Sequence, residues 1–206
     1  MTGPLPRAFY LRDTLQVAKD LLGCELVHKS EAGLTSGLIV EVEAYIGPRD
    51  PASHAYRGIR SDRTRVQYEE GGRAYVYRIY GMYCCFNVVT QGQDMPEVVL
   101  VRALEPRRGI PEMRRRRGLG ADADLRSLTS GPGRLCQAMG IDMASYGLDL
   151  CSRRLFVRAG HPGAKRDLVA TRRINIDYAG AAANWRWRFY LKDNPFVSRP
   201  LFPKRH

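Results

Sequence analysis

The order of strand-like and helix-like runs is the feature that most constrains the fold of this chain. Three apolar and aromatic runs, residues 74–80, 83–89 and 98–104, follow one another, and elsewhere strands and helices mix without a regular βαβ alternation. A parallel sheet requires such an alternation, because each parallel connection needs a long crossover. The sequence therefore predicts an α+β fold, a mainly antiparallel β-sheet with flanking helices and long loops.

Caps and breakers predict the remaining elements. Asp13 is a good N-cap for a helix that ends near Leu22, where Gly23 stops it. Residues 46–73 are punctuated by glycine and proline and predict a long irregular segment, which in a compact domain is usually functional or disordered. Residues 118–128 predict a loop or short helix. Further helices are expected over residues 110–117 and 134–139, and further strands over residues 24–28, 38–45, 155–158, 173–178 and 186–191.

Length and composition favour a single domain over residues 1–206, with residues 1–7 as a flexible tail. Of the 206 residues 44% are apolar, which is enough to bury one core. The sequence contains no apolar run of about 18 residues, so no membrane span is expected. Its first residues lack the apolar core of an export signal. We therefore expect a cytoplasmic protein, associated with the nucleoid if its source is bacterial.

Cysteine usage and the standard motifs predict neither a metal nor a cofactor. The chain has five cysteines, an odd number, and none of them forms a C-x-x-C pair. This pattern argues against a disulfide framework and a zinc site. The phosphate loop, G-x-G-x-x-G, G-x-S-x-G and H-E-x-x-H motifs are absent as well.

The strong positive charge indicates a polyanionic partner. The chain has 33 Lys and Arg against 21 Asp and Glu, so its formal net charge is 33 − 21 = +12. Basic side chains near phosphates release counterions, and the planar guanidinium of arginine suits phosphates and bases. The alternative is a GC-rich genome, which favours arginine codons whatever the function. Attraction to a membrane surface is less favoured, since no long basic amphipathic helix is evident.

The predicted strand over residues 38–45 places carboxylates beside an aromatic ring. Alternation groups Glu41, Glu43 and Tyr45 with Ile39 on one face, and the strand runs into the long loop that contains His54. A carboxylate beside an aromatic ring could activate water next to a stacked planar substrate. An ordinary solvated strand face remains the alternative.

Tyrosines and buried polar groups give further candidates on the next strands. Tyr75 and Tyr77 share one strand face and could stack on bases, although tyrosines on a sheet are often structural. Arg102 shares a face with Val98 and Leu100 and needs an anionic partner, either in a structural ion pair or at a catalytic carboxylate. Asn87 could satisfy backbone groups or read the edge of a base.

The segment Ser130-Gly-Pro-Gly-Arg134 opens a predicted helix. Free backbone N–H groups and the positive end of a helix dipole suit a phosphate at such a position. A serine N-cap without any ligand is the alternative.

Taken together, these segments resemble the alkyladenine (3-methyladenine) DNA glycosylase family. The resemblance runs from about Leu15 to Ser198. Any single motif is weak, but this many in one order make chance an implausible explanation. The motifs are Leu21-Leu-Gly, Val40-Glu-Val-Glu-Ala-Tyr-Ile-Gly-Pro48, Ser53-His-Ala55, Tyr75-Val-Tyr77, Ile79-Tyr-Gly-Met-Tyr83, Val101-Arg-Ala-Leu-Glu-Pro106, Ser130-Gly-Pro132, Leu135-Cys-Gln-Ala138 and Arg188-Phe-Tyr190.

The resemblance implies a base-excision repair enzyme that flips a damaged purine out of duplex DNA and hydrolyses its N-glycosidic bond. The implied substrates are 3-methyladenine, 7-methylguanine, hypoxanthine and ethenoadenine, without a ranking. Glu43 matches the family's general base, and Arg102 matches the arginine that helps to hold the water and the carboxylate. The backbone carbonyl of Ile176 matches a further water contact. Hydrolysis without strand cleavage is implied, by a monomer with no obligate protein partner.

The resemblance also implies a base pocket and a DNA-contacting surface. Tyr45, His54 and Tyr77 match residues that stack on and hydrogen-bond the flipped base, and stacking is expected to favour a cationic alkylated base. Asn87 matches a pocket-wall residue that rejects guanine. Tyr80 matches the residue that wedges into the duplex. The remaining residues expected near the wedge, the pocket or the DNA backbone are Met82, Leu100, Arg63, Ser130, Gly131 and Arg134.

One loop departs from the family pattern and leaves its role and the substrate range open. Where the family often has Arg-Asn followed by Met and Phe, residues 61–68 read SDRTRVQY. Arg63 keeps the basic residue, Thr64 replaces the amide, and Glu69 and Glu70 add negative charge near the expected DNA surface. Two alternatives to a DNA glycosylase are a non-catalytic protein that recognises damaged DNA and an RNA-binding or RNA-modifying domain.

Overall fold

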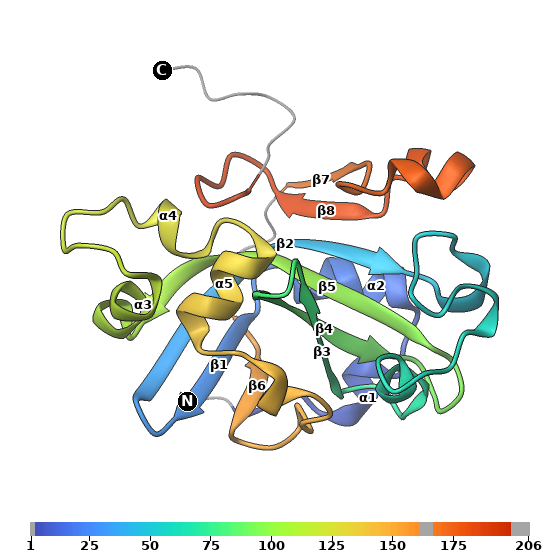
Figure 1. The fold of residues 1–206 in the computed structure, drawn as a ribbon, viewed down its shortest axis with the longest axis horizontal. Coiled ribbons are helices and arrows are strands. Elements are labelled where there is room, and N and C mark those ends of the chain that lie inside the picture. The colour runs from blue at the N-terminus through green and yellow to red at the C-terminus, as the bar shows by residue number, and fades with distance from the viewer. Residues whose placement is uncertain (1–2, 161–166, 199–206) are drawn as a thin grey trace.

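The fold is built on one curled antiparallel sheet (Figure 1). A computed structural model describes residues 3–160 and 167–198. The strands are β1 (Glu25–Ser30), β2 (Gly33–Tyr45), β3 (Ala74–Ile79), β4 (Tyr83–Thr90), β5 (Glu97–Arg108), β6 (Leu155–Arg158), β7 (Leu168–Thr171) and β8 (Arg188–Leu191). The helices are α1 (Arg7–Tyr10), α2 (Thr14–Leu21), α3 (Ile110–Arg117), α4 (Arg126–Thr129) and α5 (Pro132–Met139).

The long strands β2 and β5 form the centre of the sheet. Six strands follow the order β3-β4-β5-β2-β1-β6, and β8 pairs with both β2 and β7. Every pair is antiparallel. The single domain and the α+β fold with a mainly antiparallel sheet are thereby confirmed. One edge of β2 pairs first with β1 and then with β8, so β2 joins the β1–β6 pair and the β7–β8 pair to the rest of the sheet.

The main core lies on one face of the sheet. Val17 and Leu21 of α2 and Leu135 and Met139 of α5 are buried in the same apolar cluster as Phe86 of the sheet. Asp13 is the N-cap of α2, as predicted, and its carboxylate accepts from the Gln16 N–H at 2.9 Å. The other face of β2 to β5 is left for the polar and aromatic side chains described below.

Several boundaries and one strand differ from the prediction. Residues 173–178 do not form a strand, because Asn175 adopts a left-handed conformation (φ 59°) and the Ile174 N–H donates to a side chain rather than to a strand. The strand β7 was not predicted. Of the expected flexible tail, residues 3–7 are described: the Leu5 N–H donates to the Val157 carbonyl oxygen, and Arg7 begins α1. Residues 1–2 lie outside the described part.

A double irregularity in the β2–β5 pairing changes the predicted alternation. The register runs from Ile39 opposite Leu104 to Glu41 opposite Ala103, so Val40 has no partner on β5. It then passes to Val42 opposite Val101, so Arg102 has no partner on β2. Ile39 therefore packs in the main core with Val42, whereas alternation had grouped Ile39 with Glu41. Such β-bulges re-aim side chains and increase the local twist of a strand.

Two glycines that flank α3 provide a test of this packing. Gly109 and Gly118 both have positive φ, but a Cβ on Gly109 would lie 2.4 Å from the Leu34 carbonyl oxygen, whereas Gly118 has nothing within 4 Å. Gly118→Ala should cost about 1 kcal/mol of unfolding free energy for backbone strain alone. Gly109→Ala should cost about 2 kcal/mol more, because the backbone must also move. Equal losses in urea unfolding would contradict this account.

Candidate active site

A cavity of about 520 Å³ opens on the face of the sheet opposite the main core. It is within the size range of small-molecule sites. Strands β2 to β5 form its floor, and segments 46–73, 130–134 (which includes the first residues of α5) and 174–178 form its walls. The predicted site residues that line it are Tyr45, His54, Arg63, Tyr77, Tyr80, Asn87, Leu100, Arg102, Ser130, Gly131, Arg134 and Ile176.

Strand alternation explains which side chains reach the cavity. On β5, Leu100 and Arg102 line it, while Val99 and Val101 are buried in the main core. Asn87 lines it from the adjacent strand β4 and is almost fully buried. The Asn87 side-chain N–H donates to the Tyr75 carbonyl oxygen at 3.0 Å, which fixes the orientation of the amide.

The Glu43 carboxylate lies behind the cavity wall and is fully buried. Its Oε2 accepts from the Tyr45 hydroxyl at 2.8 Å and from Arg102 Nη1 at 3.3 Å. Its Oε1 accepts from the Ile174 N–H at 2.8 Å. Tyr45 and Arg102 line the cavity, so the carboxylate is one side chain away from it.

Arg102 links Glu43 to a second buried carboxylate, Glu41. Arg102 Nε donates to Glu41 Oε1 at 3.0 Å, and Arg188 Nε donates to the same oxygen at 2.8 Å. Burial alone would raise the pKa of Glu41, but Arg102 and Arg188 hold that pKa below its usual value. Burial would likewise lower the pKa of Arg102, but Glu43 and Glu41 raise it. The two carboxylates and the two guanidiniums therefore form one continuous buried network.

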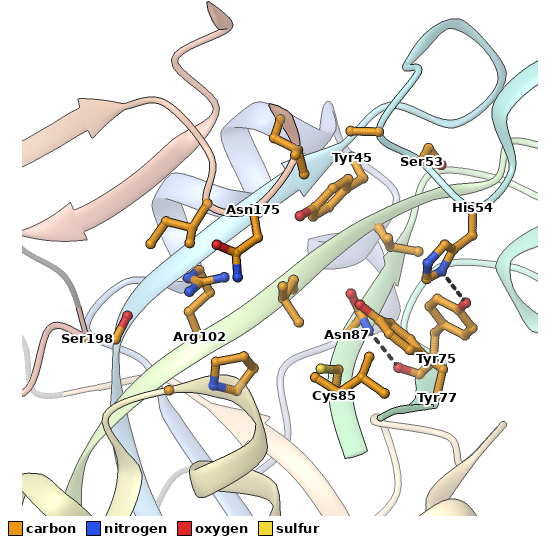
Figure 2. A pocket seen from close by; sticks show the side chains of 18 of the residues that line it. Tyr45, Ser53, His54, Tyr75, Tyr77, Cys85, Asn87, Arg102, Asn175 and Ser198 are labelled. Atoms are coloured by element: carbon orange, nitrogen blue, oxygen red, sulfur yellow. Dashed lines mark hydrogen bonds between the residues drawn. The ribbon is translucent and has the colours of Figure 1, made fainter. Parts of the chain in front are cut away.

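Aromatic rings face each other across the cavity. Figure 2 shows the Tyr45 ring on one side and Tyr75, Tyr77 and His54 gathered on the other. The His54 and Tyr77 rings meet edge to face, with centroids 4.6 Å apart. Burial, followed by the Glu43 charge, raises the pKa of Tyr45, so its hydroxyl stays protonated and can donate to that carboxylate.

His54 is oriented by two neighbours, and burial keeps its imidazole neutral. Its Nδ1 lies 2.8 Å from the Tyr75 hydroxyl, and its Nε2 lies 3.2 Å from Arg63 Nη2. Arg63 can only donate, so Nε2 is the acceptor and the ring proton belongs on Nδ1. Burial, followed by the Arg63 charge, lowers the pKa of His54 to about 4.

The β3–β4 turn presents two exposed side chains, Tyr80 and Met82. Tyr80 and Gly81 both have positive φ, 51° and 71°, and the Met82 N–H donates to the Ile79 carbonyl oxygen. The Tyr80 and Met82 side chains are 83% and 72% exposed. A tyrosine in the left-handed region is uncommon and strained, and such strain is concentrated at functional sites. Tyr80 lines the cavity, whereas Met82 does not.

The predicted helix start at 130–134 has a different cap from the one expected. Gly131 is the N-cap of α5, and Pro132 is the first helical residue. The Ser130 hydroxyl instead donates to the Phe196 carbonyl oxygen at 2.9 Å. Arg134 is exposed at the rim of the cavity.

Some residues of the site were missed by sequence reasoning. Ile176 lines the cavity, but its carbonyl oxygen, which the resemblance matched to a water contact, accepts from the Ala179 N–H. The backbone group that contacts Glu43 is the N–H of Ile174, which was not predicted. The other cavity residues without a predicted role include Gln67, Cys85, Asn175, Tyr178 and Ser198. Alternation could have indicated Cys85, which shares a strand face with Asn87, but it does not indicate the others, because loops distant in sequence bring them to the cavity.

A buried ion pair supports the Tyr45 wall from behind. Arg173 Nη2 donates to Asp50 Oδ1 at 2.8 Å, and Arg173 Nη1 donates to the Ala44 carbonyl oxygen at 3.0 Å. Arg173 Cζ lies 4.7 Å from the centroid of the Tyr45 ring. Both charged side chains are completely inaccessible to solvent.

In the described residues, no three His, Cys, Asp or Glu side chains are grouped so as to hold a metal ion. None of the helices there has the length and apolar character needed to cross a membrane.

Breaking the buried ion pair between Asp50 and Arg173 should destabilise the fold. Asp50→Asn leaves Arg173 without a buried counter-charge, which typically costs about 3–5 kcal/mol. Asp94→Asn is a matched control, because its ion pair with Arg60 is largely exposed and is worth less than about 1 kcal/mol. Urea unfolding of both variants measures the difference, and similar losses would show that the buried pair has no special role.

Comparison with known proteins assigns the family. A profile of the methylpurine-DNA glycosylase family matches residues 8–195. Similar proteins from Bacillus cereus strain G9842 (50% identical), Bacillus mycoides strain KBAB4 (48%) and Alkaliphilus oremlandii strain OhILAs (48%) are each named "Putative 3-methyladenine DNA glycosylase". Each alignment spans 201 residues, 94–95% of this chain and 98% of the relative. The chain therefore belongs to the methylpurine-DNA glycosylase family.

Proposed function

We propose that this protein flips a damaged purine out of duplex DNA and hydrolyses its N-glycosidic bond with a water molecule activated by Glu43. The observation that carries the proposal is the buried, arginine-paired Glu43 carboxylate behind an aromatic cavity. The proposed substrates are 3-methyladenine, 7-methylguanine, hypoxanthine and ethenoadenine. Membership of the methylpurine-DNA glycosylase family supports the reaction class, hydrolysis of N-glycosyl bonds in DNA.

Base flipping is required because the reacting sugar carbon is inaccessible in a stacked duplex. Extruding a nucleotide costs a few kcal/mol, and less for a damaged base that pairs or stacks poorly. In the proposal, the exposed Tyr80 ring enters the duplex and fills the space that the extruded base leaves. The strained turn that projects Tyr80 from the sheet supports this role.

The aromatic walls of the cavity suit a flat purine. Stacking on an aromatic side chain stabilises an extruded base by roughly 1–3 kcal/mol. Tyr45 on one side and Tyr77 with His54 on the other provide the two proposed stacking surfaces. Asn87, whose amide is fixed by its hydrogen bond to the Tyr75 carbonyl oxygen, is the proposed contact for one edge of the base.

The contacts of Glu43 support its role as the general base. An ionised carboxylate has about four lone-pair sites, and the donors described above occupy two on Oε2 and one on Oε1. One site on Oε1 remains for a water molecule. The same negative charge would stabilise the oxocarbenium-like sugar of the transition state. Because the nucleophile is water, the product is an abasic site in an uncut strand.

Glu43→Gln should abolish base release and leave DNA binding intact. The amide preserves the shape of the side chain but removes the charge and the proton acceptor, so single-turnover release should fall by about 10²-fold or more. The substrates are duplexes that carry hypoxanthine or 7-methylguanine. Glu31→Gln, an exposed residue in the β1–β2 turn, is the matched control and should behave as the parent does.

The outcome also separates the alternatives. If the parent protein binds damaged duplex but releases no base, the protein is a recognition protein and the proposal is wrong. Tighter binding to structured RNA than to a hypoxanthine-containing duplex would instead support an RNA-directed function.

Arg134 is proposed to contact a DNA phosphate beside the cavity mouth. Arg134→Ala should weaken binding to damaged and undamaged duplexes alike and reduce the slope of log K against log salt by about one. Arg153→Ala removes an exposed arginine away from the cavity and serves as the control. An Arg134→Ala slope equal to that of the parent would exclude Arg134 from the phosphate contacts.

A further inference from the structure

We propose that Arg63 makes this cavity discriminate against positively charged bases, so that neutral damaged purines are bound in preference to cationic ones. The inference rests on the proposed function and deepens it, since it names the substrate class by charge. It reverses the expectation that the tyrosine walls favour a cationic alkylated base.

The two stacking tyrosines already have cationic partners. Arg173 Cζ lies 4.7 Å from the Tyr45 ring centroid, and Arg63 Cζ lies 4.8 Å from the Tyr77 ring centroid. A guanidinium over an aromatic ring takes up part of the electrostatic attraction that the ring offers to a cation. A second cation stacked on the same rings would gain less and would also be repelled by the arginines.

The two arginines differ in how their charges are balanced. The Arg173 charge is neutralised by its buried pair with Asp50. Arg63 lines the cavity and, among the residues that the structure describes, forms no ion pair with a carboxylate. A base against Tyr77 would therefore lie beside a guanidinium whose charge no neighbouring acid offsets.

The other charged groups around the cavity do not reverse this balance. Glu43 and Glu41 are paired with Arg102 and Arg188, and the other charged residue that lines the cavity, Arg134, is also positive. His54 is neutral and accepts from Arg63 through Nε2, so it does not offset the charge of Arg63. The base-binding wall is thus positive overall.

Arg63 can also donate hydrogen bonds to a neutral base. A guanidinium carries five N–H donors, and the contacts of Arg63 with His54 and Tyr75 engage only some of them. The remaining donors can reach a carbonyl oxygen or a ring nitrogen of a bound purine. A neutral purine such as hypoxanthine presents such acceptors without the opposing positive charge.

The decisive variants are Arg63→Gln and Arg63→Lys. Single-turnover release is measured from duplexes that carry neutral hypoxanthine or cationic 7-methylguanine, and the ratio of the two rates is compared with that of the parent. In Arg63→Gln the neutral-to-cationic ratio should fall about tenfold, the scale of one partly screened charge. Arg63→Lys keeps the charge, so its ratio should stay within about threefold of the parent's.

Arg65→Gln is the matched control, because Arg65 is two residues away, lies 5.6 Å from the Tyr146 ring and does not line the cavity. Losing a charge there can weaken DNA binding, but it should change both rates by the same factor. If Arg63→Gln also changed both rates equally, the inference would be wrong.

A binding measurement separates this inference from the proposed function. Neutral 9-methyladenine and permanently cationic 3,9-dimethyladeninium are titrated into parent and Arg63→Gln protein, and the His54 ring signals are followed by NMR. The parent should bind the neutral base more tightly, and Arg63→Gln should narrow the gap about tenfold. An unchanged gap would overturn the role of Arg63, even if the parent released no base from DNA.

Discussion

The buried network of Glu41, Arg102, Glu43 and Arg188 is the interaction on which the rest of the site depends. Two carboxylates and two guanidiniums pair with each other inside the protein, so the buried Glu43 carboxylate has a guanidinium partner in place of solvent. Bulges in the β2–β5 pairing let adjacent residues of these strands reach the same face. The Ile174 N–H, in a loop distant in sequence, supplies a third donor to the Glu43 carboxylate.

The aromatic cavity is arranged around this network. Tyr45 belongs to both, since its ring lines the cavity and its hydroxyl donates to Glu43. A base stacked on that ring would therefore sit next to the carboxylate, and recognition and hydrolysis would be coupled through one side chain. Arg173 lies against the Tyr45 ring and Arg63 against the Tyr77 ring, and of these two arginines Arg63 has no acidic partner in the described structure.

Much of this arrangement follows from the sequence, and the exceptions have physical reasons. Alternation on β5 correctly predicted that Leu100 and Arg102 share a face. It failed at Val40, because a bulge adds one residue without a change in composition. It also predicted a strand at 173–178, where apolar and polar residues alternate but Asn175 turns the backbone into the left-handed region. Family resemblance identified cavity residues on distant loops, such as His54, yet it gave no indication of the Arg173–Asp50 pair behind Tyr45.

The most direct test is a crystal structure of the protein bound to a duplex that contains 2′-fluoro-2′-deoxyinosine, whose glycosidic bond resists hydrolysis. We expect hypoxanthine between Tyr45 and Tyr77, Tyr80 within the duplex, and a water molecule bound to Glu43 Oε1 and directed at the sugar C1′. A base that stays stacked in the duplex, or one that enters the cavity with C1′ far from Glu43, would contradict the central claim.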